Sequence, residues 1–417
     1  MQRLSSRVRQ SAIQALDNWS EGHVYAETLV AKNAERLNLG PGDRGLLNAI
    51  VLGVLRHMRL LDFWISLLRP EGRLDISTRN ALRVGLVQLL ILEVTEHAAV
   101  NETVEAAPRK VRGLVNGVLR SALRRKPELL ERAGSADLGV RFSHPDWLLK
   151  RWQNDFGTEQ THVLLEWNNQ PAETFIRANS LKEGSEQVIE AAETTTPVDN
   201  SPGFYQLRGP LPKEWIQGGL VYAQDPATRH SVELLAPKAG EKILDACAAP
   251  GGKAALIAAL AHNQAQLVCT DSNAKRLPRL AENLNRLGVE NVQTLTHDWT
   301  FAAPPGFQTA FDAILLDVPC SNTGVLRRRV DARWRLTADA ITDVAEVQRT
   351  ILENALPCLK PGGRIVYSTC SIDREENRDL VEAFCGDHDD ITLVEDVRIF
   401  PHEHGTDGAY ATLLQKS

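Results

Sequence analysis

From Gly240 onward, short apolar runs alternate with segments of helical spacing, and this pattern constrains the fold more than any other feature. Buried strands that alternate with helices pair into a parallel sheet covered on both faces. We therefore predict a doubly wound, Rossmann-like α/β domain over residues 238–417, with the usual strand order 3-2-1-4-5. The predicted strands are Lys242–Ala246, Gln266–Thr270, Val292–Thr296, Ala313–Leu316 and Arg364–Tyr367, with a last one at Tyr410–Leu414, and the predicted helices are Ala254–Leu260, Asn273–Leu287 and Ala338–Leu359.

The front of the chain has a different periodicity. From Arg3 to about Lys126 the apolar residues recur at helical spacing, and Asp75 offers an N-cap, so we predict an all-helical domain over residues 1–135. A stretch of low apolar density, Pro127–Ser143, is predicted to be a linker. Residues 144–237 are predicted to form a small α+β domain, with helices Asp146–Phe156 and Glu159–Asn168 and a strand Thr174–Asn179. A chain of 417 residues has room for three such units.

Charge and composition exclude several classes of protein. With 43% hydrophobic and 24% charged residues, the chain is neither disordered nor fibrous. The net charge is −6, but residues 1–140 carry 20 Lys and Arg against 15 Asp and Glu, which leaves −11 for the rest. This asymmetry is compatible with an RNA-docking module fused to an enzyme, although surface charge often serves only solvation.

Cysteine usage and apolar runs bear on metal sites and on the compartment. The six cysteines form no C-x-x-C pair, and His402-Glu403-His404 lacks a third ligand, so we expect no metal site. No apolar run approaches the 18 residues of a membrane span, and basic residues interrupt the start of the chain. We therefore expect a cytoplasmic protein with reduced thiols and no membrane partner.

A turn rich in small residues follows the first predicted strand. Small side chains let a backbone approach a ligand closely, and paired glycines allow a tight turn from strand to helix. The absence of G-x-G-x-x-G disfavours an NAD enzyme, and the absence of a Ser or Thr after the lysine disfavours a P-loop NTPase. The predicted cofactor turn consists of Cys247, Ala248, Ala249, Pro250, Gly251, Gly252 and Lys253.

Two aspartates end the next two predicted strands. Asp271 follows the second strand, where a carboxylate can accept hydrogen bonds from both ribose hydroxyls of an adenosine group. Asp298 follows the third strand and is placed to reach the adenine end. Either aspartate alone is more often a cap or a solvated turn residue. Three strand-end features in the right order, however, favour a nucleoside-bearing cofactor.

The fourth and fifth predicted strands end in a second constellation. Asp317 and Cys320 follow the fourth strand, Cys370 follows the fifth, and these strands are neighbours in the predicted order. A lone cysteine is usually a small core residue, but two at adjacent strand ends beside an acid indicate chemistry. Alkylation of a cytosine carbon needs such residues, because C5 attacks a methylsulfonium only after a thiolate has added to C6. From the residues alone either cysteine can be the nucleophile.

The other groups of this constellation have predicted roles too. Asp317 suits hydrogen bonding to N3 or to the exocyclic amine, if it is protonated or shares a proton. A free thiol has a pKa near 8.5 and needs help to ionise, which Lys253 or a helix N-terminus can supply.

Together these motifs resemble the NOL1/NOP2/Sun family of RNA m5C methyltransferases. The resemblance implies S-adenosylmethionine as methyl donor, bound by Cys247–Lys253, Asp271, Asp298 and Asp317. It also implies that Cys370 is the nucleophile and that Cys320 assists release of the product. Asp317 then activates the cytosine, with Lys253 beside it. The assignment of Cys370 rather than Cys320 comes from the family alone.

Further segments resemble the bacterial members of this family that methylate 16S rRNA. Asp43-Arg44, Val100-Asn101-Glu102 and Asn116-Gly117 resemble a NusB-like helical RNA-binding domain, and Arg177-Ala178-Asn179 and Tyr222–Asp225 extend the match through an RRM-like middle domain. The resemblance implies methylation of cytosine 967, with 16S rRNA or a small-subunit assembly intermediate as partner and a monomeric enzyme. Methylation of tRNA or DNA, and a non-catalytic RNA-binding assembly factor, are the alternatives.

Two basic clusters are candidates for RNA contact. A cytosine within a helix must flip out to expose C5 and C6, and phosphate contacts offset that cost. In both clusters a solvated surface is the competing interpretation. The first, predicted on one helix, is Arg109, Lys110, Arg112, Arg120, Arg124, Arg125 and Lys126, and the second is Arg327, Arg328, Arg329, Arg333 and Arg335, with Trp334 as a base-stacking candidate.

Overall fold

The computed structural model describes residues 2–22 and 24–417, with side chains from Ser6 onward, so Met1 and His23 of the predicted helical domain lie outside the described residues. Contacts divide the chain into two units. The helical unit comprises the residues up to 170 together with 329–335, and the sheet unit comprises 171–328 and 336–417.

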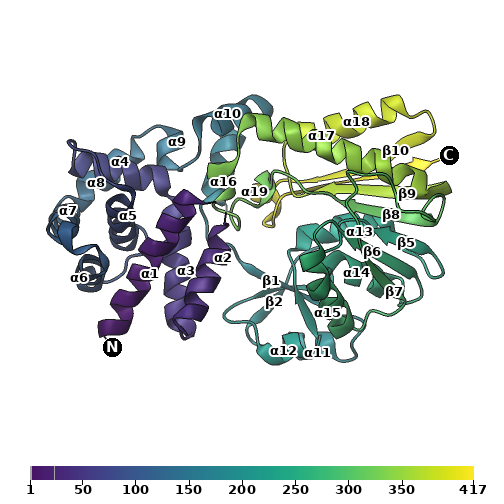
Figure 1. Cartoon of the computed structure of the whole chain (residues 1–417), viewed down its shortest axis with the longest axis horizontal. Coiled ribbons are helices and arrows are strands. Elements are labelled where there is room, and N and C mark those ends of the chain that lie inside the picture. Colours follow the sequence, from purple (N-terminus) through teal and green to yellow (C-terminus); the bar gives the residue numbers. More distant parts are fainter. Residues whose placement is uncertain (1, 23) are drawn as a thin grey trace. The chain divides into compact units, whose positions relative to one another are not determined.

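The helical unit is built around α1, which packs against α2, α3, α5 and α6 (Figure 1). Its core is mostly aliphatic, with Leu16 and Leu47 fully or almost fully buried, and it also contains the ring of Trp64. The all-helical prediction for this part of the chain is confirmed. The elements are α1 Gln2–Glu21, α2 Ala26–Arg36, α3 Pro41–Arg56, α4 Met58–Leu68, α5 Ile76–Leu90, α6 Glu96–Ala106, η1 Arg109–Val111, α7 Arg112–Arg124, α8 Lys126–Gly134, α9 Leu138–Arg141, α10 Asp146–Asn168 and α16 Ala332–Arg335.

Two predictions from local sequence can be compared with the helical unit, namely the cap at Asp75 and the linker at Pro127–Ser143. Asp75 caps α5 as predicted, because its Oδ1 accepts a hydrogen bond from the Thr78 amide at 2.9 Å. The linker predicted over Pro127–Ser143 is wrong, since α8 and α9 occupy it. Its few apolar residues include Leu129 and Ala133, which are four positions apart and buried on one face of α8. The helical spacing of the apolar residues, rather than their number, therefore indicates the structure of this segment.

The helix α10 bears on the predicted domain boundaries. It unites the two predicted helices across Gly157, whose φ of +80° interrupts the helical geometry. Contacts place α10 in the helical unit, whereas the sequence analysis assigned it to the middle domain. The predicted boundaries at 135, 144 and 237 stay a prediction.

The segment 329–335 belongs to the core of the helical unit, although the chain around it belongs to the sheet unit. Val330 is fully buried in the aliphatic core, and the fully buried Arg333 donates to Asn168 O at 3.0 Å and to Asn169 Oδ1 at 2.9 Å. Trp334 Nε1 donates to Leu55 O at 2.7 Å. The prediction that Arg333 contacts RNA is therefore wrong, because its side chain is fully buried, whereas Trp334 is half-buried and its stacking on a base stays a prediction.

The sheet unit begins with a small antiparallel sheet of strand order β2-β3-β1-β4. Its apolar face, which includes Ile176, Tyr205 and Val221, packs with Ile189 and Trp215 from two short helices. The predicted strand at 174–179 is β1. The elements are β1 Thr174–Ala178, α11 Ser185–Glu190, β2 Thr195–Pro197, β3 Phe204–Leu207, α12 Lys213–Gln217 and β4 Val221–Ala223.

A seven-stranded sheet of order β10-β11-β9-β8-β5-β6-β7 follows. Helices α13, α14 and α15 cover one face and α17 and α18 cover the other (Figure 1), each with its own apolar cluster. The elements are η2 Pro226–Thr228, α13 Arg229–Leu235, β5 Lys242–Asp245, α14 Gly252–Leu260, β6 Gln266–Asp271, η3 Ala274–Arg276, α15 Leu277–Leu287, β7 Val292–Thr296, β8 Phe311–Asp317, η4 Thr323–Val325, α17 Ala338–Ala355, η5 Leu356–Cys358, β9 Leu359–Thr369, η6 Arg374–Glu376, α18 Arg378–Asp387, β10 Ile391–Ile399, α19 Pro401–His404 and β11 Ala409–Lys416.

The predicted strand order is confirmed for the five parallel strands, β7-β6-β5-β8-β9. The sheet is mixed beyond these five strands, because β11 pairs antiparallel with β9 and β10 pairs antiparallel with β11. β10 itself went unpredicted, since it is an edge strand in which charged residues such as Glu395 and Asp396 interrupt the apolar positions.

Two glycines of the helical unit allow a matched stability test. A Cβ on Gly85 of α5 would lie 2.5 Å from Leu119 Cδ2, a fully buried side chain, whereas a Cβ on Gly117 of α7 meets nothing within 4 Å. Overpacking a core costs about 1–3 kcal/mol, while Gly→Ala in an exposed helix gains up to about 1 kcal/mol. We expect Gly85→Ala to lower the midpoint of thermal unfolding and Gly117→Ala to preserve or raise it, as measured by calorimetry. Equal effects of the two substitutions would contradict this packing.

Candidate active site

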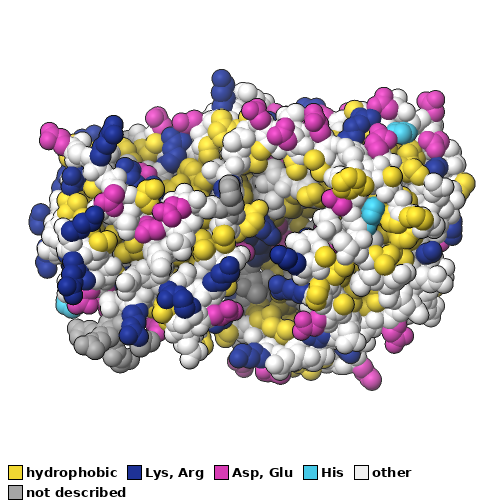
Figure 2. All heavy atoms as spheres, in the orientation of Figure 1, with side chains coloured by type: hydrophobic (Ala, Val, Ile, Leu, Met, Phe, Trp, Pro, Cys, Tyr) yellow, Lys and Arg dark blue, Asp and Glu magenta, His cyan; other side chains and the backbone are white. Residues whose placement is uncertain are grey.

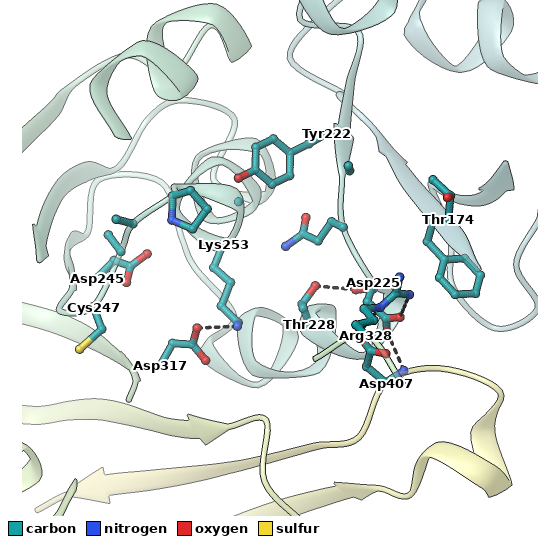
Figure 3. A pocket seen from close by; sticks show the side chains of 17 residues that line it. Thr174, Tyr222, Asp225, Thr228, Asp245, Cys247, Lys253, Asp317, Arg328 and Asp407 are labelled. Carbon is teal, nitrogen blue, oxygen red and sulfur yellow. Dashed lines mark hydrogen bonds and ion pairs between the residues drawn. The ribbon is translucent and has the colours of Figure 1, made fainter. Parts of the chain in front are cut away.

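The carboxyl ends of the parallel strands enclose three cavities of the sheet unit. The central cavity has about 400 Å³ and is lined by Lys253, Asp317 and Asp407 among others (Figure 3). The thiol cavity has about 170 Å³ and is lined by Cys370 together with the same three residues. The rim cavity has about 370 Å³ and is lined by Asp271, Asp298 and Asp317. Asp317 therefore lies at the junction of all three cavities.

The predicted cofactor turn joins β5 to α14 at this junction. Gly251 has φ of +104°, and a Cβ there would lie 2.9 Å from Leu280. Gly252 has no room for a side chain either, because a Cβ would lie 2.6 Å from the ring of Tyr222. The two glycines thus meet the steric demands on which the prediction of a close-approach turn depended.

Three polar side chains that the sequence analysis did not single out for this role hold the turn in place. Arg276 donates to Ala249 O, Asn283 Nδ2 donates to Pro250 O at 2.9 Å, and Arg177 Nη2 donates to Gly252 O at 3.2 Å. Arg177 is almost fully buried, and burial lowers its pKa to about 10. These residues come from elements distant in sequence, so spacing along the chain could not have identified them.

Asp245, the last residue of β5, is a buried carboxylate without partners at bonding distance. It is 1% exposed, it lines the central cavity, and neither oxygen has a hydrogen-bond partner among the described residues. Burial, reinforced by the Asp317 carboxylate, raises the pKa of Asp245 to about 7. Such an acceptor suits the ammonium end of a cofactor. Its place at a strand end was the available sequence signal.

The two rim aspartates lie where the sequence analysis placed them. Asp271 ends β6; its Oδ2 forms an ion pair with Arg276 at 3.0 Å and its Oδ1 accepts from the Asn273 amide. Asp298 lies two residues beyond β7 and accepts from Thr300, whose backbone hydrogen bond lowers the pKa of Asp298. Ile351 of α17 adds an apolar wall to the rim cavity. A hydroxyl-bearing nucleoside fits this combination.

Lys253 and Asp317 form an ion pair that spans two of the cavities (Figure 3). Lys253 Nζ lies 2.7 Å from Asp317 Oδ2, and Ser368 Oγ donates to Asp317 Oδ1 at 3.0 Å. Burial would lower the pKa of Lys253, but the attraction of Asp317 outweighs it and the pKa is raised. The proton that Asp317 was expected to share is thus supplied by a lysine ammonium.

Cys320 and Cys370 meet, as the order of the strands predicts. Their Sγ atoms are 3.0 Å apart, and the Cys370 amide donates to Cys320 Sγ at 3.3 Å. Both are free thiols. The hydrogen bond with Cys370, and then burial, raise the pKa of Cys320. Cys370 lines the thiol cavity, whereas Cys320 lines none of the three cavities.

A buried carboxyl group joins the two cysteine loops. Glu376 is fully buried; its Oε2 accepts from the Ser321 amide at 2.8 Å and its Oε1 accepts from Ser371 Oγ at 2.6 Å. Burial raises the pKa of Glu376, against the hydrogen bonds from Ser321 and Ser371. The sequence analysis missed this residue, because Glu375-Glu376 beside a helix start resembles an exposed acidic turn.

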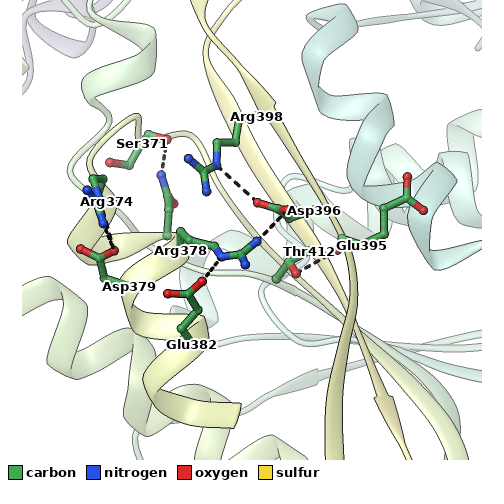
Figure 4. A network of polar contacts seen from close by, with 10 residues as sticks. Ser371, Arg374, Arg378, Asp379, Glu382, Glu395, Asp396, Arg398 and Thr412 are labelled. Carbon is green, nitrogen blue, oxygen red and sulfur yellow. Dashed lines mark hydrogen bonds and ion pairs between the residues drawn. The ribbon is translucent and has the colours of Figure 1, made fainter. Parts of the chain in front are cut away.

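The chain after Cys370 is fastened by further polar contacts (Figure 4). Arg374 forms an ion pair with Asp379 at 2.9 Å, and Arg378 of α18 forms one with Asp396 of β10 at 2.9 Å. Asn377 Nδ2 donates to Ser371 O at 2.9 Å. The position of the thiol therefore depends on contacts with two neighbouring elements.

Three further arginines of the second cluster, Arg327, Arg328 and Arg335, also have protein partners. Arg328 lies between Asp225 and Asp407, at 2.9 and 2.7 Å. Arg327 is 3% exposed, and Arg335 Nη2 donates to Val24 O at 2.6 Å. Arg328 and Arg335 are half-buried and Arg328 lines the central cavity, whereas Arg329 is exposed, so an RNA contact by these three arginines stays a prediction.

The first basic cluster extends over three elements rather than one helix, namely η1, α7 and the start of α8. Arg109, Lys110, Arg120 and Arg124 are exposed, whereas Arg125 is paired with Glu128 at 2.9 Å. Figure 2 shows Lys and Arg side chains interspersed with Asp and Glu on the face of the helical unit that it displays. The exposed members stay candidates for phosphate contact.

The described part of the chain shows neither a metal-binding cluster nor a membrane-spanning helix. No group of three or more His, Cys, Asp or Glu side chains there is arranged to hold a metal ion, and His402-Glu403-His404 belongs to the short helix α19 and its N-terminal turn rather than to a loop. None of the described helices combines the length and apolar character that crossing a bilayer requires.

Family models match each part of the chain. The model described as 16S rRNA methyltransferase RsmB/F matches residues 232–415, and the NusB family model matches residues 6–124. A ferredoxin-like domain of RsmF/B-like methyltransferases matches residues 144–195. The NusB-like, ferredoxin-like and methyltransferase parts of the predicted architecture are thereby confirmed.

Individual relatives extend this likeness over most of the chain. The ribosomal RNA small subunit methyltransferase B of Vibrio cholerae is 38% identical over 415 residues, which cover 95% of this chain and 94% of the relative. The protein of the same name from Salmonella newport is 38% identical over 85% of this chain and 84% of its own length. The crystal structure of PH0851 superposes with a TM-score of 0.80 at 25% identity and covers 99% of both chains.

Asp245→Asn tests the binding of the methyl donor. The amide keeps the size of the side chain but cannot pair with an ammonium, so we expect the Kd for S-adenosylmethionine to rise about 10–100-fold. In the wild type, ionisation near pH 7 must accompany binding, so affinity should weaken from pH 8 to pH 6. In the variant this dependence should be absent. Calorimetric titration at three pH values measures both effects.

Stability gives the matching readout for the same variant. A carboxyl whose pKa is about 7 in the folded chain and 3.8 otherwise makes the folded state less stable as pH rises through that window. Asp245→Asn removes this loss, so its unfolding midpoint at pH 8 should equal or exceed that of the wild type. Asp312→Asn is the control and should leave binding unchanged. Asp312 lies near the amino end of β8, away from the carboxyl ends of the strands, and pairs with Lys360. Wild-type affinity in Asp245→Asn would refute the assignment.

Proposed function

The chain belongs to the family of 16S rRNA methyltransferases RsmB/F, and from this premise we propose that it methylates C5 of one cytosine in 16S rRNA through a covalent adduct. Methyltransferases of this family use S-adenosylmethionine as the methyl donor. The observation that carries the proposal is the pair of thiols 3.0 Å apart beside the Lys253–Asp317 ion pair. The proposed target is cytosine 967, the position that the family resemblance implies.

The residues around the three cavities suit the donor. When bound, S-adenosylmethionine supplies an electrophilic methyl group on a sulfonium. Asp271 and Asp298 would hold the nucleoside end in the rim cavity, and Asp245 would hold the ammonium end. The small residues of the turn Cys247–Gly252 leave space between those ends. Asp317, at the junction of the cavities, lies between donor and target.

Cys370 acts as the nucleophile in this proposal. Its thiol gives up its proton to solvent, the thiolate Sγ adds to C6 of the cytosine, and the electron pair of the C5–C6 double bond moves through the ring toward N3. Lys253, acting through Asp317, stabilises the charge that develops there or delivers the proton. C5 becomes enamine-like and can form the new bond to the methyl carbon. One observation favours Cys370 over Cys320, namely that Cys370 lines the thiol cavity whereas Cys320 lines none of the three cavities.

Cys320 acts in product release. Its pKa is raised mainly by the hydrogen bond with Cys370. Once Cys370 Sγ is bonded to C6 it carries no charge, so this cause disappears and the pKa of Cys320 falls, and Cys320 can lose its own proton to solvent and become a thiolate. It can then take up the C5 proton, directly or through water, while the C5–C6 double bond re-forms and expels Cys370 as a thiolate. The two cysteines thus act one after the other, Cys370 as the nucleophile and Cys320 as the base that allows release.

Substitution of each cysteine separates the two roles. We expect Cys370→Ala to abolish transfer of label from S-adenosylmethionine to rRNA, and to form no adduct. Cys320→Ala should instead accumulate a protein–RNA adduct that survives denaturing electrophoresis, because elimination is slowed. Cys358→Ala, a buried cysteine of η5 that lines none of the three cavities, is the control. The reverse pattern at Cys320 and Cys370 would show that the assignment is wrong.

Removal of the protein from a cell tests the substrate. We expect one 5-methylcytosine to disappear from 16S rRNA, at position 967, when RNA is mapped by bisulfite sequencing. Complementation with the wild type should restore it, and complementation with Cys370→Ala should not. Unchanged 16S rRNA with a loss in tRNA would instead identify the alternative substrate.

A further inference from the structure

Asp407 has an unusual position that the mechanism above does not use. It precedes β11, is 7% exposed, and lines both the central cavity and the thiol cavity. Its Oδ2 is held by Arg328 Nε at 2.7 Å, and its backbone amide donates to Asp225 Oδ1 at 3.1 Å. Its Oδ1 is buried and has no hydrogen-bond partner among the described residues.

Charged groups surround the Asp407 carboxyl, but none of the described residues donates a hydrogen bond to its Oδ1. Two carboxylates, Asp225 and Asp407, share one guanidinium, Arg328. Burial, and then the Asp225 carboxylate, raise the pKa of Asp407 to about 7, against the attraction of Arg328. An unsatisfied buried acceptor is costly, and such costs are met where a ligand later supplies the missing partner.

The oxygen is also rigidly placed. Arg328 is fixed by its two carboxylates, by a hydrogen bond to Glu173 O at 2.7 Å and by the ring of Phe175. The next residue, Gly408, donates to Gly324 O at 2.8 Å, and Gly324 in turn donates to Cys370 O. Asp407 is therefore held in register with the loop of the proposed nucleophile.

Figure 3 shows Asp407 on the side of the central cavity away from the Lys253–Asp317 pair. In the proposed function, a flipped cytidine must bring C6 to Cys370 and one ring edge to Lys253–Asp317. A cytidine carries two hydrogen-bond donors, the exocyclic amine of the base and the 2′-hydroxyl of the ribose. A wall that faces the Lys253–Asp317 pair is placed to meet one of them.

We propose that the free oxygen of Asp407 accepts a hydrogen bond from the target nucleotide, from its amine or its 2′-hydroxyl, and so helps to select the substrate. This inference rests on the proposed function. It adds a recognition residue opposite the reacting groups. Amine recognition would separate cytosine from uracil, and hydroxyl recognition would separate RNA from DNA.

Asp407→Asn is an informative variant because Arg328 dictates its orientation. The guanidinium donates only to an oxygen, so the amide NH₂ must take the place of the partnerless Oδ1, where it would oppose a donor from the nucleotide. We expect kcat/KM on natural RNA to fall about 10–100-fold, while the Kd for S-adenosylmethionine stays within about 2-fold. Asp407→Ala, with no group to reorient, is a second variant, and Asp312→Asn is again the matched control.

Three RNAs complete the test, all measured under single-turnover conditions with wild type and variants. They carry cytidine, 2′-deoxycytidine or the amine-free pyrimidin-2-one ribonucleoside at the target position. The penalty of the Asp407 substitutions should shrink to less than about 3-fold on the one analogue that lacks the recognised donor. The 2′-deoxy result identifies the ribose, and the pyrimidin-2-one result identifies the base.

Two outcomes would overturn the inference while leaving the proposed function intact. One is an equal penalty on all three RNAs, which would indicate a structural role. The other is full activity of both Asp407 variants on natural RNA. If the wild type itself transfers no methyl group to cytidine RNA, the proposed function is refuted, and the inference falls with it.

Discussion

The parallel pairing of β8 with β9 is the constraint on which the site depends. In this register Asp317 lies opposite Ser368, so the chain leaves both strands at the same level of the sheet. Three residues beyond Asp317 and two beyond Ser368 the chain reaches Cys320 and Cys370, whose Sγ atoms are 3.0 Å apart. A shift of one residue would turn these side chains to opposite faces. Glu376 accepts hydrogen bonds from Ser321 and Ser371, the serines that follow the two cysteines, and so holds the two loops in the same register.

Charge in the cavities is organised around one lysine. Asp245, Asp317 and Asp407 are carboxylates at three walls, but only Asp317 is paired with Lys253. Among the described residues, neither Asp245 nor Oδ1 of Asp407 has a hydrogen-bond partner, and burial raises the pKa of both carboxyl groups. The pair in the middle is satisfied within the protein, whereas the carboxylates on either side require donors from outside. This division separates the group that assists the reaction from those that would bind cofactor and substrate.

Sequence reasoning found the groups that follow strand ends. Asp271, Asp298, Asp317 and the two cysteines could be predicted because strand order places all carboxyl ends at one edge. Arg333 was misjudged, since an arginine-rich segment resembles an RNA contact until its burial is known. Asp407 and Glu376 went unnoticed for the same reason. Their significance comes from burial and from partners distant in sequence, which no local pattern encodes.

Two buried carboxylates without full hydrogen bonding reduce the stability of the folded chain, yet both lie in cavities next to reacting groups. A core selected for stability alone would replace such groups with apolar or fully bonded ones. Both carboxylates are understandable if ligands complete their hydrogen bonds. Binding would then offset the free-energy cost of burying each carboxylate without a partner. In that arrangement donor and nucleotide would each stabilise the chain, and the rigid loops around Cys370 would need little further movement before reaction.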